Sequence, residues 1–132
     1  MLESTYGISK SLGNVEFDDA VSKVTEALKT EGFGVLTEID IKATLKKKLD
    51  VDFRPYVILG ACNPPIAHKA LSAEPGIGLL LPCNVVVAET DEGDAVVSVV
   101  NPREMFKVVN NDSILPLADE VEAKLKAALD AI

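Results

Sequence analysis

The chain has only two cysteines, Cys62 and Cys83, and each is followed by an asparagine, Asn63 and Asn84. A thiol that loses its proton can act as a nucleophile, enter a reversible disulfide or bind a soft metal ion. Twenty residues separate the two cysteines, and this spacing matches no standard zinc motif. The twin Cys-Asn segments therefore mark the best candidate site in the chain.

Cys62 ends an apolar run, and the following Asn63-Pro64-Pro65 is typical of a helix N-terminus. A sulfur at this place could lie near free backbone N–H groups and the positive end of a helix dipole, which lower the pKa of a thiol. The alternative is a small buried side chain that closes the strand, with Asn63 serving only as the N-cap. Both interpretations stay open at the level of sequence.

Cys83 follows Pro82 in a second apolar run, which we expect to lie beside the first. Three interpretations follow if the strands are neighbours. The two sulfurs could form a reversible disulfide, they could bind a soft metal together, or Cys83 and Asn84 could shape a β-bulge.

Two further residues belong to the candidate pocket. His68 is the only histidine and falls about one and a half turns into the predicted helix, where it could act as a third ligand or a base. An exposed histidine without a function is the alternative. Tyr56 shares one strand face with Cys62 by parity, so it could line the same pocket.

Periodicity predicts the elements that carry these residues. Gly32 is expected to end the first helix, and Asp40 to cap the second. Pro82 signals a bulge or an edge position inside its strand, and Asp112 or Ser113 is expected to cap the last helix. The predicted strands cover 5–12, 33–39, 56–61, 78–88 and 95–100, with helices over 17–31, 41–49, 64–73 and 114–132.

The resulting order is β-α-β-α-β-α-β-β-α, which predicts an α+β fold with one mixed or antiparallel sheet packed by helices. With 132 residues and 48% apolar content, the chain is expected to be a single domain, 1–132, with its own core. The net charge of -8 argues against nucleic acid as a partner. No signal-like start or bilayer-length apolar stretch is present, so we expect a cytoplasmic protein with no membrane partner and reduced thiols.

Longer segments resemble a known family. The runs at 31–40, 59–67 and 78–87, with the two Cys-Asn segments as their most specific part, resemble domain of unknown function family 302. The resemblance covers nearly the whole chain. It implies a small α+β domain, broadly like the TATA-binding protein in layout, that forms homodimers. It implies neither nucleic-acid binding nor an established reaction.

The leading hypothesis is a homodimer that binds a small molecule or a soft metal in a pocket around Cys62, Asn63, Cys83 and Asn84, with His68 and Tyr56 as further candidates. A second hypothesis is a thiol-dependent enzyme or redox sensor with Cys62 as the reactive thiol. A third is an assembly module in which both Cys-Asn segments serve only the fold. The sequence indicates no particular cofactor.

Overall fold

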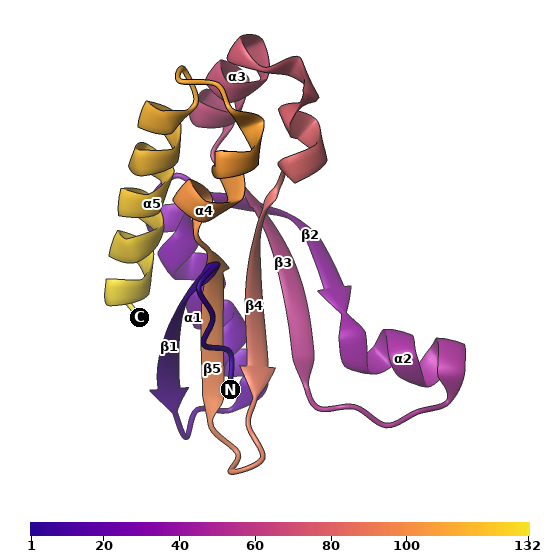
Figure 1. Cartoon of the computed structure of the whole chain (residues 1–132). Coiled ribbons are helices and arrows are strands. Elements are labelled where there is room, and N and C mark those ends of the chain that lie inside the picture. The colour runs from indigo at the N-terminus through magenta and orange to yellow at the C-terminus, as the bar shows by residue number, and fades with distance from the viewer.

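The computed structural model describes all residues, 1–132, and contains one five-stranded antiparallel sheet. The spatial order of the strands is β1-β5-β4-β3-β2, so β3 and β4, which carry the two cysteines, are neighbours (Figure 1). This confirms the predicted α+β fold and selects the antiparallel alternative. The strand bounds are β1 (Gly7–Gly13), β2 (Gly34–Asp40), β3 (Tyr56–Cys62), β4 (Cys83–Glu89) and β5 (Ala95–Val100).

One face of the sheet is covered by α1 (Phe17–Thr30) and α5 (Leu115–Asp130). The central strands bury every second residue against these helices, because side chains alternate between the two faces of a strand. Leu59 and Val85 are fully buried on this face. Each such side chain contributes roughly 1.5–3 kcal/mol relative to exposure in water, so this layer is the main source of stability.

The opposite face of the sheet has no helix on it and carries half-buried apolar side chains, among them Ile58 and Val86. Beyond the edge strand β2, helix α2 (Ile41–Leu49) stands away from the body of the molecule (Figure 1). As expected, Asp40 caps this helix by accepting a hydrogen bond from the N–H of Ala43 at 2.9 Å. None of its residues is buried, and its main neighbours are the strands β2 and β3.

A smaller apolar cluster forms beyond one end of the sheet. It joins α3 (Pro64–Ala73), the 3₁₀ helix η1 (Pro75–Leu80), α4 (Pro102–Phe106) and the N-terminal part of α5; a short 3₁₀ helix η2 (Lys107–Val109) follows α4. Asn101 caps α4, its side-chain oxygen accepting from the N–H of Arg103 at 3.1 Å. These short elements enclose the region into which the cysteines point.

Two local predictions are wrong. Residues 78–80 belong to η1 rather than to a strand, and β4 starts only at Cys83. Pro82 therefore precedes the strand instead of forming a bulge within it, because β4 lies between two neighbours and a proline there would lack a ladder donor. The last helix begins at Leu115 without a side-chain cap from Asp112 or Ser113.

The helices of the structure include none that is both long and apolar enough to cross a bilayer.

Candidate functional site

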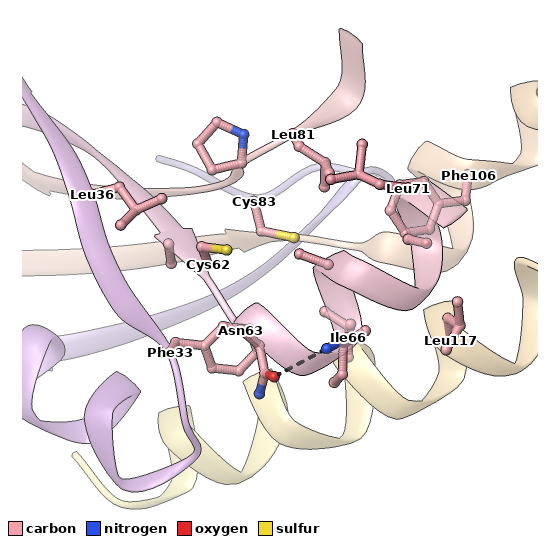
Figure 2. A pocket seen from close by; sticks show the side chains of 15 residues that line it. Phe33, Leu36, Cys62, Asn63, Ile66, Leu71, Leu81, Cys83, Phe106 and Leu117 are labelled. Atoms are coloured by element: carbon pink, nitrogen blue, oxygen red, sulfur yellow. Dashed lines mark hydrogen bonds between the residues drawn. The ribbon is translucent and has the colours of Figure 1, made fainter. Parts of the chain in front are cut away.

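An apolar cavity of about 280 Å³ opens where the ends of β3 and β4 meet α3, α4 and α5 (Figure 2). Thirteen of its fifteen lining residues are hydrophobic, and none is charged. The cavity therefore offers a solute apolar contact and almost no ionic or hydrogen-bonding partners. Its lining residues are Phe33, Leu36, Ala61, Cys62, Asn63, Ile66, Ala67, Ala70, Leu71, Leu81, Pro82, Cys83, Phe106, Leu117 and Val121.

Both cysteines line this cavity, and both are free thiols. Cys62 is the last residue of β3 and is half-buried, whereas Cys83 is the first residue of β4 and is only 6% exposed. In the β3–β4 ladder Cys83 lies opposite Ala61, one residue before Cys62. The two cysteines therefore lie on neighbouring strands and line the same cavity, as expected.

The side chains of Cys62 and Cys83 start from opposite faces of the sheet. Ala61 and Cys83 are paired and point to the helix-covered face, so Cys62 leaves its strand from the other side. Because β3 ends at Cys62, no further strand residue separates this side chain from the cavity. Figure 2 shows both sulfur atoms on the side of the strands that faces α3.

The buried thiol of Cys83 is held in its neutral form. Burial, followed by the proximity of Cys62, raises the pKa of Cys83 to about 11 from its usual value of 9.0. Since a nucleophile must be a thiolate, Cys83 is unsuited to attack at neutral pH. Any covalent chemistry in the cavity would therefore have to start at Cys62.

The N-terminus of α3 does not provide the donors that the sequence suggested for Cys62. Pro64 and Pro65 occupy the first two positions and have no N–H group. The N–H of Ile66 donates to the side-chain oxygen of Asn63 at 3.5 Å, and that of Ala67 donates to the backbone oxygen of Asn63 at 2.9 Å. The prediction of free N–H groups beside Cys62 is therefore wrong for the first turn of this helix.

The buried side chain of Asn63 connects two helices through hydrogen bonds. Besides capping α3, its side-chain amide donates to the backbone oxygen of Glu31 at 3.3 Å, just after the end of α1. The adjoining Gly32 has a φ of +83°, as expected for a residue that ends a helix. Asn63 therefore ties the end of α1 to the start of α3 and lines the cavity with an amide that is already hydrogen-bonded.

The other predicted pocket residues lie elsewhere. His68 is exposed on α3 and does not line the cavity. Tyr56 and Asn84 line a separate, more polar depression on the open face of the sheet. Asn84 pairs with Gly60 without a register shift, so the predicted bulge is wrong.

The suggested three-ligand set of Cys62, Cys83 and His68 is also wrong. No group of three or more His, Cys, Asp or Glu side chains comes close enough to hold a metal ion. The two thiols alone share a site.

Most residues of the cavity wall are not marked by any pattern in the sequence. Phe33 directly precedes β2 and Leu36 lies within it, whereas Phe106 and Leu117 come from the C-terminal third of the chain. Leu36 lies at a register shift between Val35 and Thr37, which turns it out of the regular ladder. No local pattern in the sequence marks these residues as partners of the cysteines.

The fold and the site define a small α+β protein with an apolar cavity and a pair of free thiols at the end of its sheet. The family model "Domain of unknown function DUF302" matches residues 8–132, so the chain belongs to this family. The crystal structure of an uncharacterized conserved DUF302 protein from Bacillus stearothermophilus is similar, with 29% sequence identity and a TM-score of 0.88. The match covers 97% of this chain and 98% of that chain. A comparison with curated proteins found no match.

Proposed function

We propose that the protein binds a small, uncharged and mainly apolar molecule in the cavity beside Cys62 and Cys83. The observation that carries this proposal is the composition of the wall, in which thirteen of fifteen residues are hydrophobic and none is charged. The volume of about 280 Å³ lies just below the usual range of small-molecule sites, roughly 300–1,000 Å³, so the ligand must be small. A charged ligand would lose its hydration here without gaining a partner.

The few polar groups in the wall restrict the ligand further. Both polar groups of the Asn63 side chain are engaged within the protein, and the Cys83 thiol is neutral and a weak hydrogen-bonding group. A ligand with several donors or acceptors would leave them unpaired on binding, at about 1–3 kcal/mol each. The cavity therefore favours a compact molecule with an aromatic or branched aliphatic body.

The neutral dye N-phenyl-1-naphthylamine, which fluoresces in apolar surroundings, tests this proposal. We expect saturable binding at one site per chain by the native protein. Ala67 lines the cavity from α3, so Ala67→Trp should fill part of the space and weaken binding. Ala73 is exposed at the end of the same helix and outside the cavity, so Ala73→Trp is the matched control and should bind normally.

Circular dichroism must show that both variants are folded before the comparison is made. Equal binding by the Ala67 and Ala73 variants would place the dye elsewhere and would contradict the proposal. Absence of saturable binding by the native protein would contradict it as well.

We further propose that the protein is a homodimer, joined through α2 and the segment that follows it. This arm, residues 41–53, contains no buried residue and exposes Leu49, Val51 and Phe53. An isolated helix of nine residues is only marginally stable in water. Because α2 also leaves these apolar side chains exposed, we infer that a partner covers them. The half-buried apolar side chains on the open face of the sheet are a second surface that a partner would cover.

Charge supports a second copy of the chain as that partner. The arm carries four lysines and two aspartates, whereas the remaining residues carry nine Lys or Arg and nineteen Asp or Glu. A basic arm on an acidic body is complementary to another molecule of the same kind. Lys42, Lys47 and Lys48 form no salt bridge within their own chain, which leaves them available for this contact.

Native mass spectrometry and light scattering test the dimer. Leu49→Asp places a carboxylate in the arm and should shift the protein to monomer, and added salt should weaken the native dimer because surface charges are screened. Leu79 is 92% exposed but lies on η1, so Leu79→Asp is the matched control and should stay dimeric. A native protein that is monomeric at micromolar concentration, or a Leu49 variant that remains dimeric, would contradict this interface.

A further inference from the structure

The arm, residues 41–53, carries apolar and basic groups side by side. Its exposed apolar side chains are Leu49, Val51 and Phe53, and its lysines without a salt bridge are Lys42, Lys47 and Lys48. The fourth lysine, Lys46, is neutralised within the arm by Asp50 and Asp52 at 3.0 and 3.3 Å. The arm is therefore complementary to a surface that is apolar and bordered by negative charge.

A surface of this kind lies at one end of the open sheet face. Val86 and Val96 are half-buried on this face, because their neighbours along each strand are buried against the helices. The acidic turn, residues 89–94, joins β4 to β5 beside them and carries four carboxylates. Only Asp91 forms a salt bridge, with Arg54 at 3.0 Å. The carboxylates without a salt bridge are those of Glu89, Glu92 and Asp94.

The fold keeps the arm apart from the acidic turn of its own chain. Asp40, directly before α2, pairs with Val57. Tyr56, the neighbour of Val57, pairs with Ala88 directly before the turn, so the arm and the turn start from the same end of the sheet. The arm nevertheless projects beyond the edge strand β2, whereas the turn follows the interior strand β4 (Figure 1). No lysine of the arm forms a salt bridge with the turn, so contact between these complementary surfaces needs a second copy of the chain.

We propose that each protomer of the dimer lays its arm on the open sheet face of its partner, with the lysines of the arm against the partner's acidic turn. A closed twofold dimer makes this contact twice, because both protomers carry both surfaces. Burial of the apolar side chains of the arm and the sheet face supplies affinity, and charge pairing fixes where the arm lies. The inference rests on the proposed homodimer and adds the surface that receives the arm.

Charge reversal tests this contact, with native mass spectrometry and light scattering as the measurements. The arm variant is Lys47→Glu with Lys48→Glu, and the turn variant is Glu92→Lys with Asp94→Lys. These side chains form no hydrogen bond or salt bridge within the chain. We expect each variant alone to raise the dissociation constant of the dimer by more than about 10-fold, because like charges then face each other in both contacts.

Mixing the two variants, one of them isotope-labelled, is the decisive step. In a mixed dimer the reversed arm meets the reversed turn and the native arm meets the native turn, so both contacts are complementary again. We expect mixed dimers of near-native affinity. Lys23→Glu with Lys29→Glu makes the same charge change as the arm variant on helix α1, which covers the other face of the sheet. This matched control should stay dimeric.

Circular dichroism must first show that the variants are folded, and the turn variant leaves the arm itself unchanged. A turn variant that dimerises like the native protein would overturn the inference, and so would a mixed pair that stays monomeric. If Leu49→Asp abolishes the dimer while the turn variant keeps it, the homodimer stands and the arm meets a different surface. A monomeric native protein would overturn both the dimer and this contact.

Discussion

Cys62 and Cys83 lie one residue out of register on neighbouring strands, and both border the same apolar cavity. Their environments differ although they are close together. Cys62 ends its strand and is half-buried, while Cys83 begins its strand and is nearly inaccessible to water. Because of this difference in burial, the two thiols should differ in how readily they ionise and react.

The raised pKa of Cys83 predicts a loss of stability at alkaline pH. A thiol that ionises at about 11 when folded and near its usual 9.0 when unfolded has no effect on stability below pH 9, where both states are protonated. Between pH 9 and 11 the unfolded state releases the proton more readily than the folded state, so the free energy of unfolding should fall by about 2 kcal/mol by pH 11. Urea unfolding at pH 8 and pH 11 measures the change. Cys83→Ala lacks this proton and should show a smaller decrease; equal decreases would contradict the shifted pKa.

Alkylation by iodoacetamide should distinguish the thiols. At pH 8 a thiol with a pKa of about 11 is ionised in roughly one molecule in a thousand, and burial further slows access of the reagent to Cys83. Peptide mapping by mass spectrometry should show Cys62 labelled well before Cys83 in the folded protein. In denaturant the two rates should converge, and a Cys83 that reacts as fast as Cys62 in the native state would be incompatible with its buried position.

Asn63 is predicted to stabilise the fold through two separate hydrogen bonds. Asn63→Ala removes the cap of α3 and the bond to the backbone oxygen of Glu31, and should lower the free energy of unfolding by about 2 kcal/mol. Asn63→Asp keeps the oxygen that caps the helix but loses the amide donor to Glu31. Thermal and urea unfolding should rank the three proteins as native, then Asp, then Ala. A neutral effect of the alanine variant would refute this role.

Gly60 allows the close contact between β3 and the residue that precedes β4. A Cβ atom at this position would lie 2.7 Å from the side chain of Pro82 and would also overlap the hydroxyl group of Thr37. Gly60→Ala should therefore destabilise the protein by roughly 1–3 kcal/mol. Because Pro82 lines the cavity, the variant should also bind the dye more weakly. Gly34→Ala, at a strand position with open space around it, is the control and should have little effect.

The local features of the site were predictable because short-range chemistry determines them. The Asn-Pro-Pro segment indicates a helix start, and Asn63 caps α3 as expected. The apolar runs that contain Cys62 and Cys83 indicate strands, and the two strands are neighbours. The dimer, the cytoplasmic location and any ligand stay predictions.

The remainder of the site depends on long-range packing that the sequence pattern does not encode. Phe33 and Leu117 both line the cavity although they lie far apart in the sequence. The parity rule grouped Tyr56 with Cys62, but Tyr56 lies at the other end of the strand and lines the open face. Strand parity fixes which face a residue points to, and it says nothing about a cavity that wraps around the end of a strand.

Whether the cavity beside Cys62 and Cys83 binds an apolar molecule can be measured by titrating isotope-labelled, reduced protein with N-phenyl-1-naphthylamine and recording its amide NMR spectra. If the cavity holds the dye, saturable shifts are expected for the amides of Cys62, Ala67 and Cys83, which line the cavity, and none for Glu92 in the distant turn between β4 and β5. Shifts confined to the open sheet face or the arm, with the cavity residues unchanged, would contradict the proposed binding.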